Sequence, residues 1–190
     1  MRILIAEDET IIRLDLRDLL EKAGFDVCAE AKDGEEAVTL ARTIEPDLAL
    51  LDVKMPKLDG IEAARRILEE RPIPIVMLTA YGQEELVSRA IAAGVFGYLV
   101  KPFREQDLLP AIAAARARHD ELQALRAEAE SLSDALAARK VIERAKGLLM
   151  EKEQLSEQDA FARLRKASQA SGRPLRVIAE AVVATLAGDT

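Results

Sequence analysis

The chain of 190 residues has one cysteine, one histidine, no tryptophan and only six other aromatic residues. A single cysteine, Cys28, excludes an intrachain disulfide and a thiolate metal centre, and it suits a reducing cytosol. The N-terminus enters an apolar strand pattern without a signal sequence, and no apolar run approaches the ~18 residues of a membrane span. We therefore expect a cytoplasmic protein with no membrane partner.

Catalytic signatures are also scarce. The only histidine, His119, falls in a helical pattern with no nucleophile, and the sequence has no Walker-type glycine loop. These absences argue against an enzymatic output domain.

Charge is unevenly distributed along the sequence, whose net charge is −7. Residues 1–138 contain 17 basic and 27 acidic residues, whereas residues 139–187 contain ten basic and six acidic residues. An acidic N-terminal part and a basic C-terminal part suggest two functions, with a polyanion as a partner of the C-terminal part.

Chemically distinctive residues follow four runs of aliphatic residues. Glu7 and Asp8 follow Ile3–Ala6, Asp52 follows Leu48–Leu51, Thr79 follows Ile75–Leu78, and Lys101 follows Tyr98–Val100. Such runs are typical of strands buried on both faces of a parallel sheet. The carboxyl ends of parallel strands are where ligands bind, so we expect these side chains to share one edge of one sheet.

The remaining patterns predict helices between the strands. With a further strand at Phe25–Ala29, five strands alternate with five helices, of which the fourth covers Gln83–Ala93 and the fifth begins near Glu105. An Asp33/Glu36 pair resembles a capping box that opens the second helix. This order predicts a doubly wound α/β domain.

The fifth helix lacks a stop signal, because no proline or glycine occurs from Ala111 to Lys146. Residues spaced three and four apart form a heptad seam that is weak in its first half and strengthens from Leu122. The seam positions are Leu108, Ala111, Ala115, Arg118, Leu122, Leu125, Ala129, Leu132 and Leu136. The seam predicts either packing within the chain or self-association, and the sequence leaves both open. Two further helices follow, one beginning at Ser156 and ending at Gly172, the other beginning near Pro174. With the end of the long helix they predict a small three-helix all-α domain.

The acidic cluster suggests a specific chemistry. Crowded carboxylates repel one another unless a divalent cation binds them, and oxygen ligands without histidine or cysteine favour Mg²⁺. Asp52 lies centrally and can accept a phosphoryl group, with Lys101 and Thr79 stabilising the phosphoryl oxygens. Each residue alone has a simpler explanation, such as a helix cap or a solvated charge, but their joint occurrence at four strand ends does not.

Residues 1–118 resemble the receiver domain of two-component response regulators. The matching segments are Ile5–Glu9, Leu51–Pro56 with Asp59-Gly60, Leu78–Ala80 and Gly97–Phe103. The resemblance implies a flavodoxin-like sheet of order 2-1-3-4-5, phosphorylation of Asp52 by a sensor histidine kinase, and a cis Lys101-Pro102 bond. It also implies no catalysis beyond the domain's own Mg²⁺-dependent phosphorylation and dephosphorylation.

The same resemblance assigns individual roles. It implies that Asp8, Asp52 and the main-chain carbonyl of Lys54 bind Mg²⁺ directly, and that Glu7 acts through water. Tyr98 falls on the switch aromatic position, which turns inward as Thr79 moves toward the phosphoryl group.

Residues 128–187 resemble the ANTAR domain of transcription antiterminators, through Leu136–Met150, Ala160-Phe161 and Leu164–Ser168. A coiled-coil-like linker is expected over 119–135. With the receiver, the chain is similar to PdtaR-type regulators, which implies binding to hairpins of leader or nascent RNA and control of transcription termination. Arg139, Arg144, Lys146 and Gly147 are the RNA-contact candidates by this match.

Other residues of this segment have structural interpretations. Leu148, Leu149, Met150 and Phe161 are interpreted as core. A glycine inside a helix costs about 1 kcal/mol relative to alanine, so close approach of another backbone would explain Gly147, as would a bend or a helix end.

Three classes of output stay open from the residues alone. The tail could bind RNA, bind DNA, or bind protein as an adaptor. Phosphorylation could also assemble a homodimer through the helical seam. The tail offers no recognition helix after a short turn, and its one aromatic residue, Phe161, has the spacing of a core residue, which argues against a stacking platform.

Overall fold

The computed structural model describes residues 1–80, 89–90, 93–95 and 97–187. It contains two compact units, Met1–Gln123 and Ala124–Thr190, and the helix α5 (Glu105–Glu153) belongs in part to each. Within the described residues no helix is long and apolar enough to cross a membrane.

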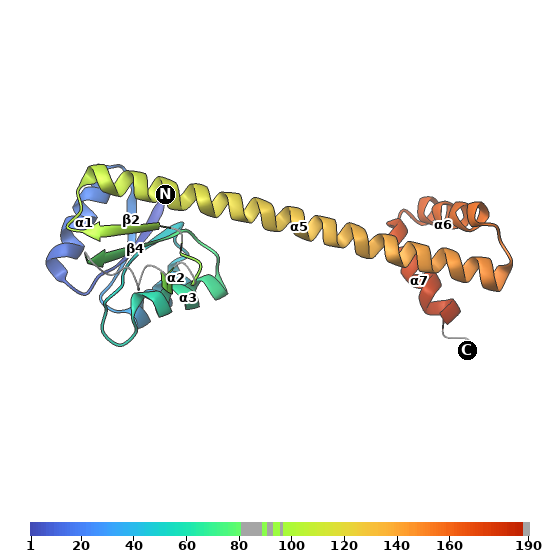
Figure 1. Cartoon of the computed structure of the whole chain (residues 1–190), viewed down its shortest axis with the longest axis horizontal. Helices are drawn as coiled ribbons and strands as arrows, with labels where there is room; N and C mark the ends of the chain where they lie inside the picture. Colours follow the sequence, from blue (N-terminus) through green and yellow to red (C-terminus); the bar gives the residue numbers. More distant parts are fainter. Residues whose placement is uncertain (81–88, 91–92, 96, 188–190) are drawn as a thin grey trace. The chain divides into compact units, whose positions relative to one another are not determined.

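The first unit is built on a five-stranded sheet of order β2-β1-β3-β4-β5, in which every described strand pairing is parallel (Figure 1). The strands are β1 (Arg2–Ala6), β2 (Asp26–Ala31), β3 (Leu48–Asp52), β4 (Ile75–Ala80) and β5 (Gly97–Lys101). The predicted doubly wound fold and strand order are confirmed. The predicted second strand begins one residue later and ends two residues later than expected.

Helices cover both faces of the sheet because alternate residues of each strand point in opposite directions. Ile3 and Ile5 of β1 share a core with α1 (Thr10–Lys22) and the start of α5. Leu4 and Ala6 share the other core with α2 (Gly34–Ile44) and α3 (Gly60–Glu70). The helix predicted over Gln83–Ala93 falls largely on residues outside the described part of the chain.

Local sequence fixes two helix starts at the functional edge of the sheet. Asp33 accepts a hydrogen bond from Glu36 N at 2.9 Å, and Asp59 accepts one from Glu62 N at 2.8 Å. The predicted cap at Asp33 is therefore confirmed. Both caps follow the carboxyl end of a strand, so they also anchor the loops beside the acidic cluster.

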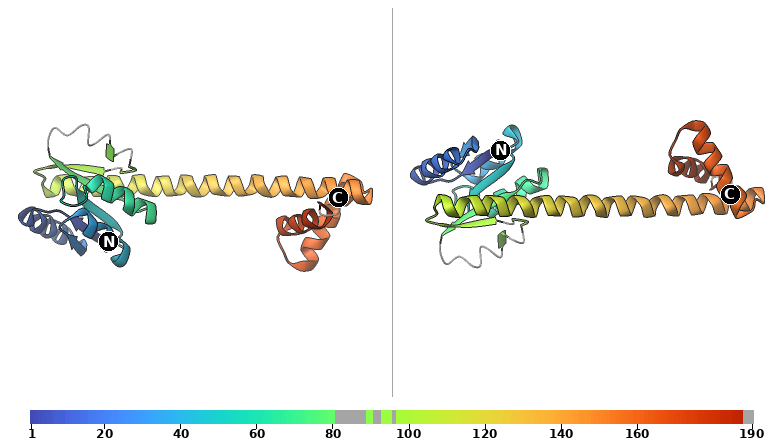
Figure 2. Two further views of the ribbon diagram at one scale, coloured as in Figure 1. Left: turned by 90° about the horizontal axis from the view of Figure 1, so that it is seen from below. Right: turned by 90° about the horizontal axis from the view of Figure 1, so that it is seen from above.

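The second unit contains the last part of α5, α6 (Glu157–Ser171) and α7 (Leu175–Ala187), which pack together as Figure 2 shows. Their shared core is small and consists of Ala145, Leu149, Ala160, Leu164 and Ala179. Ser156 caps α6 by accepting a hydrogen bond from Asp159 N at 3.1 Å, and Gly172 ends it in the left-handed conformation with φ 66°. The helix boundaries predicted at Ser156 and Gly172 are confirmed.

Two core assignments in this unit are wrong. Leu149 is buried as predicted, whereas Met150 and Phe161 are exposed. Met150 and Leu149 are neighbours on one helix, where successive side chains point about 100° apart, so a run of three apolar residues cannot bury every member against one partner face.

Candidate functional site

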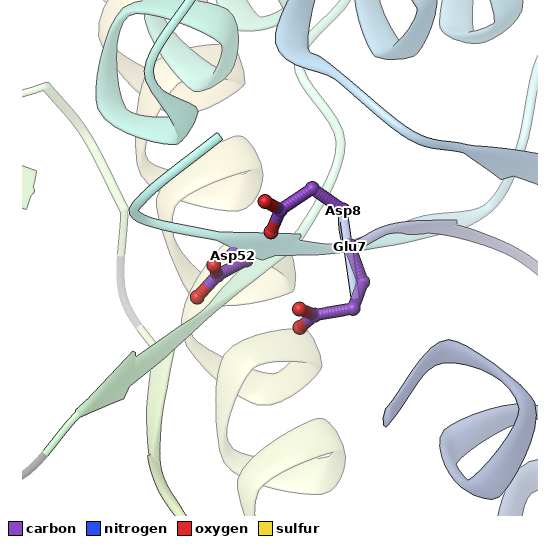
Figure 3. Close-up of side chains that lie close together, drawn as sticks. All are labelled: Glu7, Asp8 and Asp52. Carbon is purple, nitrogen blue, oxygen red and sulfur yellow. The ribbon is translucent and has the colours of Figure 1, made fainter. Parts of the chain in front are cut away.

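Three carboxylates converge at the carboxyl ends of β1 and β3, two strands that pair directly (Figure 3). Glu7 and Asp8 follow β1, and Asp52 is the last residue of β3. One oxygen from each of the three side chains lies within 4.8 Å of the others. The sheet order therefore brings together residues that are 45 positions apart in sequence.

Lys101, at the end of β5, supplies the positive charge of the cluster. Its Nζ lies 2.6 Å from Glu7 Oε2 and 3.0 Å from Asp52 Oδ1. The peptide bond that follows, Lys101-Pro102, is cis, as the resemblance implied. One ammonium group thus bridges two of the three carboxylates.

Burial changes the electrostatics of these groups. Desolvation raises the pKa of Glu7, with Lys101 opposing the shift and Asp52 adding to it. Desolvation likewise raises the pKa of Asp52, again opposed by Lys101 and reinforced by Asp8. Burial lowers the pKa of Lys101, but its hydrogen bonding to Glu7 and Asp52 raises it more, so the net shift is upward. Burial therefore disfavours the charged forms of Glu7 and Asp52, and further positive charge at the site would favour them.

The residues present fit a magnesium ion. Three carboxylates face one ammonium, which leaves an excess of negative charge, and every candidate ligand atom is oxygen. Glu7 Oε2 is buried with Lys101 Nζ 2.6 Å away, and the same Nζ lies 3.0 Å from Asp52 Oδ1. One ammonium shared between two carboxylates leaves negative charge unbalanced, and a divalent cation with its water shell would complete the site.

The two predicted switch residues occupy different environments. Thr79 is buried at the end of β4, and its hydroxyl donates to Ala80 O at 3.2 Å. Tyr98, on β5, is 55% exposed, so its ring lies outside the core. The sheet places β4 between β3 and β5, so Thr79, the last residue but one of β4, lies on the strand next to that of Asp52.

The loop between β3 and α3, residues 53–59, begins directly after Asp52. Lys54 is exposed at its start. Gly60, the first residue of α3, lies against Asp52, since a Cβ built on it would be 1.9 Å from Asp52 O. Side-chain patterns could not reveal this contact, although the Asp59-Gly60 pair was part of the segment that resembles a receiver.

Two polar contacts at this edge were not predicted. Arg13 of α1 donates through Nη1 to the main-chain oxygen of Glu7 at 2.6 Å, and Lys57 Nζ lies 2.7 Å from Asp33 Oδ2. Each joins residues that a sequence pattern does not relate, because the partner lies on another element. Neither pair has a local sequence signal that could have identified it.

The four RNA-contact candidates lie on α5, and the structure separates them. Arg139 and Arg144 are exposed and form no ion pair with the described residues. Lys146 is only 8% exposed, and its Nζ lies 3.1 Å from Glu143 Oε2, 2.6 Å from Glu157 Oε1 and 6.0 Å from the centre of the Phe161 ring. Lys146 thus links α5 to the first turn of α6.

Gly147 lies on the exposed side of α5. The helix continues six residues beyond it, so a helix end does not explain the glycine. A Cβ built on Gly147 would have none of the described atoms within 4 Å, so no close approach inside this unit explains it either.

Comparison with known families supports a signalling protein. The family described as "Response regulator receiver domain" matches residues 3–113, and the family described as "ANTAR domain" matches residues 130–183. The chain belongs to the two-component response regulators. This response regulator pairs a receiver with an ANTAR output domain, a combination that is not typical of an enzyme.

Two relatives illustrate the extent of the similarity. The "Transcriptional regulatory protein PdtaR" of Mycobacterium tuberculosis is 49% identical over 97% of this chain and 90% of its own length. The response regulator is thus of the PdtaR type. The chemotaxis protein CheY of Bacillus subtilis is 41% identical over 58% of this chain and 93% of its own.

Solved structures match the receiver unit. The signal receiver domain of a modulated diguanylate cyclase from Desulfovibrio desulfuricans is 36% identical, covers 63% of this chain and 95% of its own, and superposes with a TM-score of 0.59. A CheX-CheY-BeF3-Mg²⁺ complex from Borrelia burgdorferi is 30% identical, with a TM-score of 0.57 over 59% of this chain and 86% of that one.

Proposed function

We propose that Asp52 accepts a phosphoryl group from a sensor histidine kinase and that the ANTAR domain then controls transcription termination by binding RNA hairpins. The observation that carries the input half is the convergence of Glu7, Asp8, Asp52 and Lys101 at one edge of the sheet. The ANTAR match carries the output half. Such a protein would act in the cytoplasm, where RNA is transcribed.

Asp8, Asp52 and the main-chain carbonyl of Lys54 would hold Mg²⁺, with Glu7 acting through water. When bound, Mg²⁺ neutralises the carboxylates and the oxygens of an incoming phosphoryl group. The raised pKa values of Glu7 and Asp52 support this assignment, since Lys101 alone does not offset the desolvation of the two carboxylates. The related CheY of Borrelia burgdorferi was solved with Mg²⁺ and BeF3, which supports it further.

The proposed transfer uses Asp52 as the nucleophile. A carboxylate oxygen of Asp52 attacks the phosphorus of a phosphohistidine on the kinase, so that a P–O bond forms while the P–N bond breaks. The departing imidazole takes a proton from solvent. Lys101 then pairs with a phosphoryl oxygen, and the Thr79 hydroxyl donates to another. Hydrolysis of the resulting acyl phosphate by water would return the carboxylate.

Phosphorylation would change the conformation through Thr79 and Tyr98. Thr79 would exchange its bond to Ala80 O for one to the phosphoryl group, and Tyr98 would turn inward from its exposed position. Moving a population from 1:99 to 99:1 takes about 5.5 kcal/mol, whereas one hydrogen bond to a charged group contributes roughly 1.5–3 kcal/mol. The Thr79 bond alone is too weak, so Lys101 and burial of Tyr98 must contribute.

Acetyl phosphate with Mg²⁺ tests the input half without knowledge of the kinase. Wild type should take up phosphate, and Asp52→Asn should not. Asp26→Asn is the matched control, because Asp26 is an exposed aspartate at the opposite end of the sheet, at the start of β2. Undiminished uptake by Asp52→Asn would exclude the assignment of the acceptor.

The proposed RNA surface lies on the exposed side of α5 around Gly147. Positions 140, 144, 147 and 151 follow one face at helical spacing, and Lys140 and Arg144 on this face form no ion pair with the described residues. Arg139 flanks the same face. With no side chain at position 147, an RNA backbone could approach the helix closely while the neighbouring cations meet its phosphates. This would explain a glycine that nothing within the unit explains.

Lys146 has a different role in this proposal. Its ammonium is already paired with Glu143 and Glu157, so it would not provide a free charge for a phosphate. We propose that it positions α6 against α5, and that Lys140 replaces it among the RNA contacts.

An RNA titration tests the output half. Lys140→Gln and Arg144→Gln should each weaken binding to a target hairpin and reduce the slope of log affinity against log salt by about 0.7, as expected for one phosphate contact. Lys152→Gln is the matched control, because Lys152 is an exposed, unpaired lysine on another face of the same helix. An equal loss in all three variants would point to general electrostatics and contradict the proposed surface.

The same titration separates the alternative outputs. Preference for duplex DNA over the hairpin would favour a DNA-binding regulator. Binding to neither nucleic acid, with salt-insensitive binding to a protein, would favour an adaptor. Relief of termination in a transcription assay with purified polymerase, dependent on phosphorylation at Asp52, would support antitermination.

We also propose that the regulator self-associates through the seam of α5. Leu125, Leu132 and Leu136, at seam positions of the second unit, are 55%, 61% and 61% exposed. Pairing of two such seams would bury them. Sedimentation of wild type and of a Leu132→Lys variant, each with and without acetyl phosphate, tests this. A wild type that stays monomeric in both conditions would refute it.

A further inference from the structure

The loop that follows Asp52 is closed and packed on both sides. Gly60 N donates to Val53 O at 3.0 Å, which joins the two ends of the loop. On the side facing α2, Leu58 O lies against Gly34, where an added Cβ would be 2.2 Å from it. The loop therefore has one position relative to both β3 and α2.

A charged pair holds the middle of this loop. Lys57 Nζ lies 2.7 Å from Asp33 Oδ2, and Asp33 is buried while Lys57 is exposed. Asp33 is itself fixed, because its carboxylate also caps α2 through Glu36 N. The pKa of Asp33 is lowered by its bond to Lys57 and by the backbone bond from Glu36. An exposed lysine is thus paired with a buried carboxylate that is already fixed by its cap.

Lys57 also has an unusual backbone conformation. Its φ is 65°, and Leu58 N donates across it to Pro56 O at 2.8 Å, which defines a γ-turn. Glycine adopts a positive φ at little cost, whereas a side chain disfavours it. A favourable contact of the Lys57 side chain would offset the cost of the positive φ. The ion pair with Asp33 is such a contact.

We propose that the Asp33–Lys57 pair is a tether that sets the position of the loop, and through it the position of the Lys54 carbonyl toward Mg²⁺. Asp33 and Lys57 are positioning residues on this view, since neither belongs to the proposed ligands. The inference rests on the proposed function, in which the Lys54 carbonyl is one of those ligands. Lys57 lies three residues after Lys54 in the same loop, so release of the tether would loosen the carbonyl without removing any ligand atom.

The test is a calorimetric Mg²⁺ titration of the full chain, with four variants. Lys57→Gly removes the tether but suits a positive φ, and Asp33→Ser removes it while keeping a residue that caps helices well. Lys57→Arg keeps a positive charge at this position. Glu45→Gly is the matched control, because Glu45 also has a positive φ of 53° and an ion pair, with Arg71, but lies at the opposite end of the sheet.

Lys57→Gly and Asp33→Ser should weaken Mg²⁺ binding about tenfold, the lower end of the range for residues that orient metal ligands, because the loop keeps its other contacts. Lys57→Arg and Glu45→Gly should bind like wild type. Phosphorylation by acetyl phosphate should need more Mg²⁺ in the two weakened variants, with the rate at saturating Mg²⁺ largely kept. The melting temperature of Lys57→Gly should not fall, which separates positioning from loss of folding.

Several outcomes would overturn the tether. The proposal would be contradicted if Lys57→Gly and Asp33→Ser bound Mg²⁺ with wild-type affinity. Equal weakening in Glu45→Gly, or weakened binding in Lys57→Arg, would also contradict it. In those cases wild type still binds Mg²⁺ and is phosphorylated at Asp52, so the proposed function stands. A wild type that binds no Mg²⁺ and takes up no phosphate overturns both.

Discussion

Replacing Gly60 by alanine should disable the phosphorylation site without touching any of its charged groups. A Cβ at this position would lie 1.9 Å from Asp52 O and 2.8 Å from Asp52 C. Both are backbone atoms, so no side-chain rotation can relieve the overlap. Either the end of β3 or the first turn of α3 has to move.

The size of the movement follows from the distances. An ordinary contact begins at 3.4 Å, so the two atoms must separate by about 1.5 Å. Displacing a reacting group by about 1 Å can cost roughly 100-fold in rate, so we expect phosphorylation to slow at least 100-fold. Overpacking costs about 1–3 kcal/mol, and better helix propensity returns up to about 1 kcal/mol. A net loss of about 2 kcal/mol corresponds to a fall of roughly 8 °C in the melting temperature of the receiver.

The assay compares Gly60→Ala with Gly147→Ala, the same substitution on an open helix surface. Gly147→Ala should keep the wild-type phosphorylation rate and stabilise its unit by about 1 kcal/mol, since an added Cβ meets none of the described atoms. Phosphorylation by acetyl phosphate is followed on a gel that retards the phosphoprotein, and melting is followed by circular dichroism. A Gly60→Ala protein that is phosphorylated at the wild-type rate would refute the reasoning.

Three further predictions concern the charged groups. Burial raises the pKa of Asp52, so the stability contributed by its protonated form is present below the ordinary value of 3.8 and is lost as pH rises through the raised value. In buffer free of Mg²⁺, Asp52→Asn should therefore become more stable than wild type as pH rises from 4 to 7, and urea unfolding at each pH measures this difference. Mg²⁺ at 100 times its Kd should stabilise wild type by about 2.7 kcal/mol and Asp8→Asn far less, as thermal melts with and without the ion would show. Lys146→Gln should lower the melting temperature of the helical unit because Glu143 and Glu157 lose their shared cation, and it should leave the salt slope of RNA binding unchanged. Arg144→Gln should reduce the salt slope of RNA binding and leave the melting temperature unchanged.

Local sequence was sufficient to predict the strands, the helix caps and the acidic cluster. Strands of a parallel sheet are buried on both faces, so their aliphatic runs are visible without knowledge of any partner. Glu7, Asp52 and Lys101 stand where such runs end, and the parallel order alone places those ends at one edge. The caps at Asp33 and Ser156 were equally predictable, because a cap bonds to residues two or three positions away.

The buried face of the C-terminal helices was harder to predict, because the apolar pattern of α5 allows a neighbouring helix to pack against more than one of its faces. Arg144 and Lys146 read alike in sequence, but α6 covers the side of α5 that carries Lys146 and leaves Arg144 exposed. The same packing leaves Met150 exposed beside the buried Leu149. Which face is buried depends on the neighbouring helix, and no periodicity within α5 records where that neighbour lies.

The family, the parallel sheet and the four strand ends that carry the chemistry could all be predicted from the sequence, since each depends on contiguous residues. Three further properties became clear from the folded chain: Lys146 is buried and paired, Gly60 lies against a backbone whereas Gly147 does not, and Lys57 reaches Asp33. Those properties depend on distances between residues far apart in the chain. Burial and close contact are set by the neighbouring element rather than by the residue itself.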